Sequence, residues 1–291
     1  MTHRSPIVVG IGEILWDLFP DTKKLGGTVT NFVYHAAALG AHGVVVSSVG
    51  KDDLGRDALN ELEKRGLSRQ YIREDPDHPT STVQVDVQPG GEPVYTIHNN
   101  VAPDFLRRDS ELDELSSQAD VICYGTLAQR GPVCRETIQS FLETSRPDCL
   151  RICDINLRQK FYSPEVVTRS FELANVVKVN DDELQTVAEI FDMQGDEREL
   201  VAQISDRFKL NLVALTRGNQ GSLLRAGGEV HEHDGHKVTV EDTVGAGDCF
   251  TAALAMGLLN GDKVAAIHES ASRRAAYVCT QVGGTPLMEK A

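Results

Sequence analysis

Short, uniformly apolar runs recur along this chain and alternate with longer segments of helical periodicity. The runs are too apolar to leave one face in water, so we expect strands buried on both faces. The expected strands are Ile7 to Gly12, Val44 to Val49, Val121 to Tyr124, Leu150 to Asp154, Val176 to Val179 and Leu212 to Thr216. The main expected helices are Asn31 to Leu39, Leu54 to Arg65, Arg135 to Ser145, Pro164 to Ala174 and Glu197 to Phe208. This alternation predicts βαβ units, and hence a mostly parallel sheet with helices on both faces.

One region breaks the alternation. Polar and apolar residues alternate from Thr80 to Val87, a turn follows at Pro89-Gly90-Gly91, and the pattern resumes from Val94 to Ile97, which predicts an antiparallel hairpin. A hairpin inserted in a parallel α/β chain must leave the main sheet, so we expect a small β lid over one edge, with further strands from Leu15 to Lys24. The lid would comprise about residues 13–26 and 80–101 within one domain over residues 1–291. Its free edge makes a homodimer through the lid a hypothesis.

Charge and apolar content exclude several classes of protein. The chain has 29 Lys and Arg against 43 Asp and Glu, a net charge of −14, which argues against binding to nucleic acid or an anionic membrane. The longest near-apolar stretch, Cys249 to Leu259, is too short to cross a bilayer, and the first residues lack a signal peptide's apolar segment. We therefore expect a soluble, cytoplasmic protein.

Neither the cysteines nor the histidines form a metal-binding pattern. The six cysteines include no CxxC pair, which predicts reduced, packed thiols. His231, His233 and His236 lie close together in sequence and could be read as a metal site. Because they lie in a polar, Gly-rich stretch, a solvated hairpin with its turn is the preferred interpretation.

The segment that begins Asp242-Thr-Val-Gly-Ala-Gly-Asp248 is the most informative for chemistry. Gly245, Ala246 and Gly247 precede a long helical pattern, so their backbone N–H groups would line a helix start, where a phosphate is favoured. Asp248 would lie in the first helical turn, where its carboxylate could accept a proton from an attacking hydroxyl. The alternative is that Gly247 makes a tight turn and Asp248 only caps or charges the helix N-terminus.

Four blocks resemble the ribokinase-like, or PfkB, family of carbohydrate kinases. The stretch DTVGAGDCFTAALAMGLLNG is similar to the C-terminal motif of that family, and Gly26-Gly-Thr-Val-Thr-Asn31 with Ala37-Ala-Leu-Gly40 to its N-terminal motif. Asn180-Asp-Asp-Glu183 is similar to its NxxE motif, and Leu215-Thr-Arg-Gly218 with Gly221 to its nucleotide-side strand and loop. The resemblance implies a Rossmann-like α/β/α sandwich with a small β-sheet lid.

The resemblance also implies how the phosphate side is organised. Asp248 would be the catalytic base, and the amides of Gly245, Ala246, Gly247 and Asp248 would form the anion hole for the γ-phosphate of ATP. Asn180 and Glu183 would hold Mg²⁺ through water, although an N-cap before a helix from Asp182 to Glu189 is the alternative for this pair. The other residues implied on the ATP side are Lys178, Thr216, Gly218 and Gly221.

The sugar side is implied by residues that follow the first strand and by a second motif. Asp17 could accept two sugar hydroxyls, Gly26 and Gly27 would let the backbone approach the sugar, and Asn31 offers a donor and an acceptor. Asp154-Ile-Asn-Leu-Arg158 resembles the DxNxR block of fructokinase-like and ketodeoxygluconate-kinase-like members, so Asn156 would bind sugar and Arg158 would place a cation near sugar or phosphate.

The resulting hypothesis is an ATP- and Mg²⁺-dependent sugar kinase of fructokinase type. Ketodeoxygluconate, ribose or a nucleoside stay open as acceptors, as does a non-catalytic sugar or nucleotide sensor. A dinucleotide-dependent oxidoreductase is disfavoured because Gly10-Ile-Gly12-Glu-Ile-Leu15 lacks a third glycine, and no P-loop motif occurs. Asp242 and Gly283-Gly-Thr-Pro286 fall where related kinases bind a monovalent cation, so activation by K⁺ is a further hypothesis. The segment His98 to Asp104 leaves the lid toward the substrate and carries no assigned role.

Overall fold

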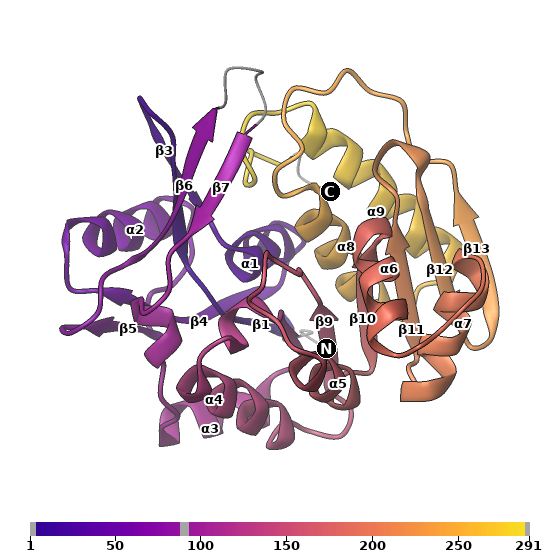
Figure 1. Cartoon of the computed structure of the whole chain (residues 1–291), viewed down its shortest axis with the longest axis horizontal. Coiled ribbons are helices and arrows are strands. Elements are labelled where there is room, and N and C mark those ends of the chain that lie inside the picture. Colours follow the sequence, from indigo (N-terminus) through magenta and orange to yellow (C-terminus); the bar gives the residue numbers. More distant parts are fainter. Residues whose placement is uncertain (1–3, 88–92, 289–291) are drawn as a thin grey trace.

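A computed structural model describes residues 4–87 and 93–288 of the chain (Figure 1). Its main sheet has, in spatial order within these residues, β13 (Glu229–His233), β12 (Ser222–Ala226), β11 (Leu212–Thr216), β10 (Val176–Asn180), β9 (Leu150–Asp154), β8 (Val121–Tyr124), β1 (Ile7–Ile11), β4 (His42–Gly50) and β5 (Ile72–Asp75). The strands from β11 to β5 are all parallel, whereas β12 and β13 are antiparallel to their neighbours. The expected mostly parallel sheet is therefore confirmed.

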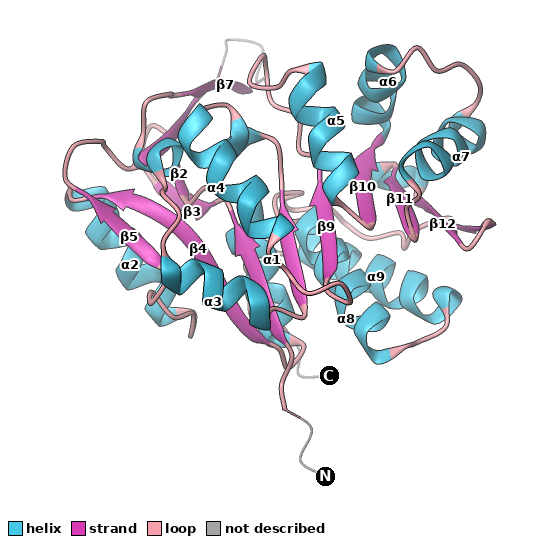
Figure 2. Ribbon diagram, turned by 90° about the horizontal axis from the view of Figure 1, so that it is seen from below, coloured by secondary structure: helices cyan, strands magenta, loops and turns pink. Residues whose placement is uncertain are grey.

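Helices cover both faces of this sheet, and each layer of helices has its own apolar core (Figure 2). One layer contains α3 (Ser110–Gln118), α4 (Pro132–Glu143), α5 (Pro164–Leu173), α6 (Asp181–Ile190) and α7 (Glu197–Phe208). The other contains α1 (Thr28–Ala38), α2 (Asp53–Lys64), α8 (Ala246–Asn260) and α9 (Val264–Cys279). Phe171 and Ile138 are fully buried in the first core and Phe32 in the second. No helix in either described layer is long and apolar enough to cross a membrane.

A small second sheet stands at one edge of the main sheet (Figure 1). Its order is β3 (Lys23–Gly26), β2 (Leu15–Leu18), β6 (Ser81–Val87) and β7 (Pro93–Ile97). The β6–β7 pair is the expected antiparallel hairpin, and β2 and β3 supply the expected further strands. The predicted turn at Pro89-Gly90-Gly91 lies outside the described residues. Trp16 in β2 anchors the small sheet, because its Nε1 donates a hydrogen bond to the Leu54 carbonyl at the start of α2 (2.9 Å).

Several element boundaries differ from those expected. Helix α1 begins at Thr28, not Asn31, because Gly27, with a φ of 116°, turns the chain directly into the helix. Helix α4 begins at Pro132, not Arg135, since proline is favoured in a first helical turn. Helices α3 and α9 and strand β5 were not expected; α3 and β5 are short and largely polar, so they lack a strong apolar period.

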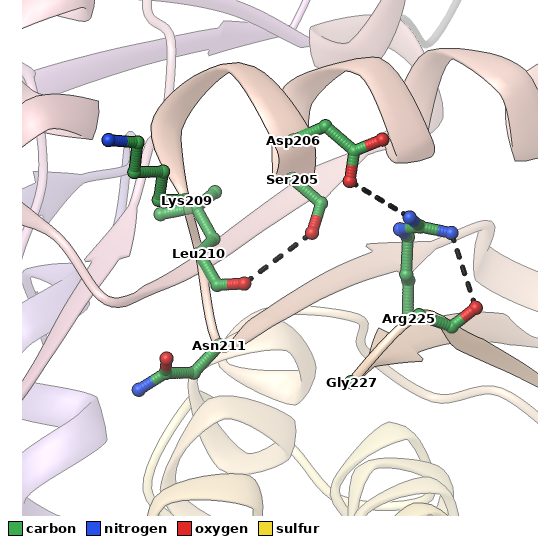
Figure 3. Close-up of a pocket in the computed structure, with 8 residues that line it drawn as sticks. Ser205, Asp206, Lys209, Leu210, Asn211, Arg225 and Gly227 are labelled. Atoms are coloured by element: carbon green, nitrogen blue, oxygen red, sulfur yellow. Dashed lines mark hydrogen bonds and ion pairs between the residues drawn. The ribbon is translucent and has the colours of Figure 1, made fainter.

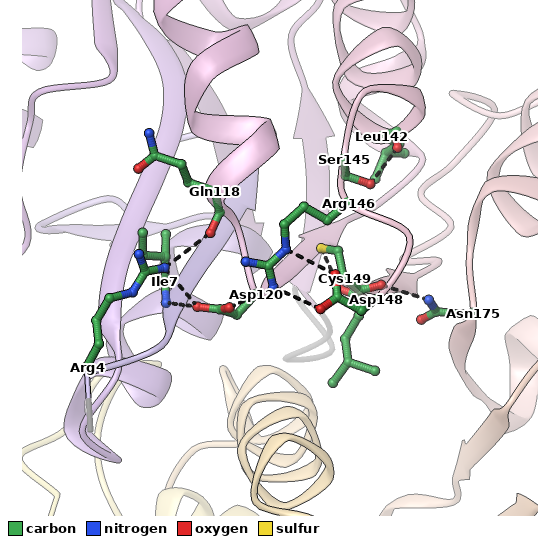
Figure 4. Close-up of polar contacts among 11 residues, drawn as sticks. Arg4, Ile7, Gln118, Asp120, Leu142, Ser145, Arg146, Asp148, Cys149 and Asn175 are labelled. Carbon is green, nitrogen blue, oxygen red and sulfur yellow. Dashed lines mark hydrogen bonds and ion pairs between the residues drawn. The ribbon is translucent and has the colours of Figure 1, made fainter. Parts of the chain in front are cut away.

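Ion pairs and hydrogen bonds join the amino ends of the central strands (Figure 4). Asp120, just before β8, accepts a hydrogen bond from the Ile7 N–H (2.7 Å) and pairs with Arg146 (3.0 Å). Asn175, just before β10, accepts from the Arg151 N–H (2.9 Å) and donates to the Cys149 carbonyl (2.9 Å). These polar side chains are thus paired with one another at the amino edge. In open α/β sheets ligands bind at the opposite, carboxyl edge, so we look for the site there. The six cysteines are free thiols, as expected.

Candidate active site

The start of α8 is a turn that only glycine can make. Gly245 is the N-cap residue with a φ of 78°, and a Cβ on it would lie 2.4 Å from the Gly284 carbonyl oxygen. Only Gly245 precedes the helix; Ala246 and Gly247 were expected before it but are its first two residues. No side chain of the described residues caps α8. The Ala246 N–H donates to the Thr243 carbonyl (3.3 Å), and the N–H groups of Gly247 and Asp248 that follow it lie at the helix start, where an anion is favoured.

Asp248 lies in the first turn of α8 and does not cap it, although its charge does lie at the helix N-terminus, as the other half of the alternative expected. Its Oδ2 accepts a hydrogen bond from Asn31 Nδ2 of α1 (2.8 Å). Burial, together with the nearby Asp154 carboxylate, raises the pKa of Asp248 to about 7, although Asn31 and Lys178 act against this rise. A carboxyl group with this pKa can gain and lose a proton near neutral pH, as a general base must.

A buried ion pair lies beneath the start of α8. Lys178 Nζ of β10 is 3.0 Å from Asp154 Oδ1 of β9, and Thr251 Oγ1 of α8 donates to the other Asp154 oxygen (2.8 Å). Burial alone would lower the pKa of Lys178, but the Asp154 and Glu183 carboxylates outweigh it and hold the pKa above its usual value. A Cβ on Gly247 would lie 3.1 Å from Lys178 Nζ. The first turn of α8 therefore lies on an ammonium group whose charge is paired with the Asp154 carboxylate.

Asn180 and Glu183 form a reciprocal cap at the start of α6. Asn180 Oδ1 accepts from the Glu183 N–H (2.8 Å), and Glu183 Oε2 accepts from the Asn180 N–H (2.9 Å). Glu183 Oε1 accepts a third hydrogen bond, from the Leu157 N–H (3.0 Å). The N-cap alternative thus describes this pair correctly. Each oxygen keeps a free lone pair, so the donor set fits the water shell of a hydrated Mg²⁺ better than direct coordination.

The remaining residues expected on the ATP side follow β11, beside Asn180. Asn180 and Thr216 are register partners at the carboxyl ends of β10 and β11. Gly218 and Gly221 have φ values of 53° and 83°, and a Cβ on Gly221 would lie 1.9 Å from the His233 carbonyl oxygen. The structure therefore brings Lys178, Asn180 and Thr216 to one edge of the sheet, with the Gly218 to Gly221 turn next to them.

The residues expected on the sugar side meet where the small sheet joins α1. The Asp17 carboxylate lies over Gly26: a Cβ added to that glycine would be 2.9 Å from Asp17 Oδ2. Burial raises the pKa of Asp17 to about 6. Asn156, with a φ of 46°, donates through Nδ2 to Thr28 Oγ1 (2.7 Å) and so ties the loop after β9 to the start of α1.

Arg158 is exposed, and its Nη1 donates to the neighbouring Leu157 carbonyl (3.1 Å). Its positive charge nevertheless acts on both halves of the candidate site, since it opposes the rise in pKa of Asp17 and of Asp248. Arg158 is therefore placed to interact with an anion that bridges the two halves.

Asp242, the expected K⁺ residue, already has partners. Its Oδ1 accepts from the Val244 N–H (3.0 Å), and its Oδ2 accepts from the Gly283 N–H (3.0 Å) and pairs with Lys24 Nζ of β3 (3.2 Å). Burial opposes ionisation, but these hydrogen bonds outweigh it and hold the pKa of Asp242 below its usual value. An ammonium group thus already neutralises this carboxylate, and K⁺ binding stays a hypothesis.

Sequence reasoning missed a buried charge cluster next to the sugar side. Arg130, which follows β8, pairs through Nε with Asp104 Oδ1 (2.7 Å), and both side chains are buried. Glu13 is also buried, which raises its pKa, and the Arg130 charge opposes that rise. A Cβ on Gly27 would lie 2.3 Å from the Glu13 carbonyl oxygen. The signals available were the glutamate directly after the first strand and the unassigned segment ending at Asp104.

A surface hollow elsewhere on the molecule is not part of this site. It is lined by Ser205, Asp206, Lys209, Leu210, Asn211, Arg225, Gly227 and Gly228 at the amino end of β11 (Figure 3). Arg225 crosses it to pair with Asp206 (2.9 Å). None of the expected site residues lines it.

Comparisons with known proteins identify related sequences. The sequence model of the pfkB family carbohydrate kinases matches residues 19–291. A probable chloroplastic fructokinase of Arabidopsis thaliana is 28% identical over 281 residues, covering 89% of this chain and 72% of that protein.

Solved structures confirm the expected fold. A Vibrio cholerae fructokinase with bound fructose, ADP and calcium superposes with a TM-score of 0.81 at 25% identity, covering 96% of this chain and 94% of the other. A 2-dehydro-3-deoxygluconokinase from Thermotoga maritima superposes with a TM-score of 0.85 at 18% identity, covering 98% and 96%. The α/β core with a small sheet at its edge is therefore an arrangement that these sugar kinases share.

Proposed function

The chain belongs to the pfkB family of carbohydrate kinases, and we propose that it transfers the γ-phosphate of ATP to a primary hydroxyl of a ketose, fructose in the first place. The observation that carries the proposal is the position of Asp248. It is a carboxyl group with a pKa of about 7, held by Asn31, in the first turn of a helix that no side chain of the described residues caps. A base and an anion site thus lie side by side, as phosphoryl transfer to an alcohol requires.

In this proposal Asp248 accepts the proton of the sugar hydroxyl as its oxygen attacks the γ-phosphorus, and the bond from phosphorus to the bridging oxygen of ADP breaks. The N–H groups at Gly245 to Asp248 receive the charge on the transferring phosphoryl oxygens. Lys178 beneath Gly247 adds a positive charge that Asp154 keeps fixed in place. Alignment and charge stabilisation supply most of the rate, and the base supplies less.

The metal would lie on the ATP side. Asn180 and Glu183 would hold the water shell of Mg²⁺ through their free lone pairs, and Asp242 with the Gly283 backbone is the place to look for K⁺. When bound, Mg²⁺ neutralises phosphate charge. Thr216, Gly218 and Gly221 would lie against the nucleotide. Gly221 has to be glycine for the turn to form, because a side chain there would collide with the backbone at His233.

The sugar would lie between the small sheet and α1. Asp17 would accept hydrogen bonds from two sugar hydroxyls, Gly26 and Gly27 would let the sugar approach the backbone, and Asn31 and Asn156 would supply further polar contacts. The Vibrio cholerae relative, which was solved with fructose and ADP, supports a ketose. We propose that the small sheet acts as a lid over this pocket.

A sugar acid such as 2-dehydro-3-deoxygluconate is the second candidate acceptor. Arg130 Nη1 is buried and has no hydrogen-bond partner among the residues that the structure describes, so a donor for a carboxylate is available next to Glu13. The Thermotoga maritima neighbour acts on such an acid. Ribose and nucleosides are the remaining alternatives from the sequence.

A coupled ADP-release assay over a panel of ketoses, aldoses, 2-dehydro-3-deoxygluconate and nucleosides tests the proposal. We expect the highest kcat/KM with fructose or another ketose. A leading rate with the sugar acid that falls in Arg130→Lys would transfer the assignment to the second candidate. Absence of turnover with every acceptor, in protein that binds ATP, would refute sugar phosphorylation.

A further inference from the structure

Two histidines and a glutamate converge at the outer edge of the main sheet. His233 is the last residue of β13, His236 follows in the next turn, and Glu269 comes from α9. Glu269 Oε2 is 2.8 Å from His233 Nε2, and its Oε1 is 3.2 Å from His236 Nε2. One ligand atom from each of the three residues lies within 4.8 Å of the other two. The sequence alone places the histidines near each other but gives no sign of the glutamate.

The surrounding fold fixes this cluster from both sides. Ser222 of β12 is the register partner of His233, and its Oγ is 2.7 Å from Nε2 of His268, the residue before Glu269. The rings of His233 and His268 have centroids 5.4 Å apart. Helix α9 is therefore held against β12 and β13 at the residue that precedes Glu269, which keeps the carboxylate facing the two imidazoles.

We propose that His233, His236 and Glu269 bind a divalent transition-metal ion of the zinc class. Two imidazoles and a carboxylate are a donor set that Zn²⁺ accepts, whereas Mg²⁺ prefers oxygen alone, so the ion differs from the one used with ATP. Ligand atoms about 2 Å from a tetrahedral Zn²⁺ lie roughly 3.3 Å apart, a spacing that small side-chain rotations reach from the observed cluster. The His236 and Glu269 side chains are 35% and 54% exposed, so water can fill a fourth position.

Binding requires a change of tautomer at one histidine. The Gly235 N–H donates to His233 Nδ1 (2.9 Å), so in the metal-free protein the ring proton is on Nε2 and faces Glu269. When Nε2 becomes a metal ligand, that proton leaves and Nδ1 takes one from solvent, so the Gly235 amide must turn away. Gly235 has a φ of 76° and no side chain, so its backbone has more conformations open to it than that of another residue.

A metal bound at this site would stabilise the neighbouring turn after β11, on the nucleotide side of the molecule. The His233 carbonyl oxygen and the backbone of Asp234 and Gly235 pack against Gly221, at the turn after β11. Residues beyond His236 lead along the chain to Gly245 at the start of α8. We therefore expect the bound metal to raise the midpoint of thermal unfolding.

The test is calorimetric titration of Zn²⁺ into EDTA-treated, full-length protein without nucleotide or Mg²⁺. We expect one ion per chain and at least a tenfold weaker affinity in both His236→Ala and Glu269→Gln. The matched control is His42→Ala, an exposed histidine at the start of β4 outside the cluster, which should bind as wild type does.

Two results would overturn the proposal: no stoichiometric Zn²⁺ binding to wild type, or binding that His236→Ala and Glu269→Gln leave unchanged. Thermal unfolding of each variant in EDTA checks that it is folded. Co²⁺ absorption, which reports tetrahedral coordination, is a second readout on wild type and on whichever variant stays folded. The titration does not involve phosphoryl transfer, so its outcome is separate from that of the kinase proposal.

Discussion

At the scale of single residues, the account depends on how Asp248 is held. Burial and the Asp154 charge favour its protonated form, whereas the hydrogen bond from Asn31 and the charges of Lys178 and Arg158 favour the carboxylate. The resulting pKa of about 7 means that the native protein binds a proton here more tightly than the unfolded chain does. This contribution to stability is complete below pH 4 or so and is lost as the pH rises through about 7.

The pH dependence of catalysis tests this balance. The kcat/KM for fructose should fall below about pH 7, because the base becomes protonated. Asn31→Ala removes a hydrogen bond that favours the carboxylate, so the acid limb should move to higher pH, whatever happens to the maximal rate. The measurement is a pH–rate profile of both proteins. An acid limb that moves to lower pH in the variant, or stays where it is, would show that another group titrates.

The sequence predicts the types of most site residues but not their partners. Asp248, Asn31 and Asp17 could be proposed as site residues because each belongs to a short motif beside a strand or helix end. The pairing of Lys178 with Asp154 depends on the register of β9 and β10, and that of Arg130 with Asp104 on how two distant loops meet. Such contacts follow from tertiary structure, and the local pattern does not contain them.

At the scale of elements, the turn into α8 is the critical feature. Gly245 both adopts a left-handed conformation and lies against Gly284, so the C-terminal loop and the helix start fit only without a side chain. Gly261, at the other end of α8, has a φ of 71° but nothing within 4 Å of the position of a Cβ. Both glycines therefore have a left-handed backbone conformation, but only Gly245 has a close contact at the position of a Cβ.

Alanine at each position separates these effects. Both Gly245→Ala and Gly261→Ala should lose roughly 1–2 kcal/mol of unfolding free energy from the left-handed backbone. Gly245→Ala should lose more and should also reduce kcat, because the contact with Gly284 must open and shift the first turn that carries Asp248. Urea unfolding and steady-state assays measure both effects. Equal stability and full activity in the two variants would mean that the contact is unimportant.

The elements themselves were predictable to the extent that burial is reflected in local pattern. Strands β1, β8, β9 and β11 are buried on both faces, and their uniform apolar runs identified them to within a residue. The edge strand β5 reads Ile-Arg-Glu-Asp, which carries no such run, and its pairing with β4 is visible only in the fold. Helix α9 likewise packs against α8 and β13, and these contacts are visible only in the fold.

At the scale of the whole molecule, the small sheet should respond to the sugar. Trp16 is the only tryptophan of the chain, is 3% exposed and neighbours Asp17 in β2. If the small sheet closes over the sugar, fructose should produce a saturable change in tryptophan fluorescence. Asp17→Asn should abolish that change at the same fructose concentrations. An equal response in the variant would indicate that Trp16 senses fructose elsewhere or that Asp17 does not bind it.

The net charge of −14 makes the whole molecule repulsive to ATP at long range, so attraction has to be local. We propose that the start of α8, which no side chain of the described residues caps, and the buried Lys178 supply it where the phosphates would lie. Because the remainder of the surface then contributes little to the reaction, loss of the Asp248 carboxyl group should stop turnover without preventing nucleotide binding.

Turnover of fructose by Asp248→Asn, measured beside wild type with calorimetric titration of ADP into both, is the most direct test. The asparagine keeps the shape and the partner of Asp248 but cannot take the proton. We predict a kcat lower by on the order of 10²- to 10⁴-fold with ADP affinity largely unchanged. A variant that phosphorylates fructose near the wild-type rate would contradict the assignment of Asp248 as the base.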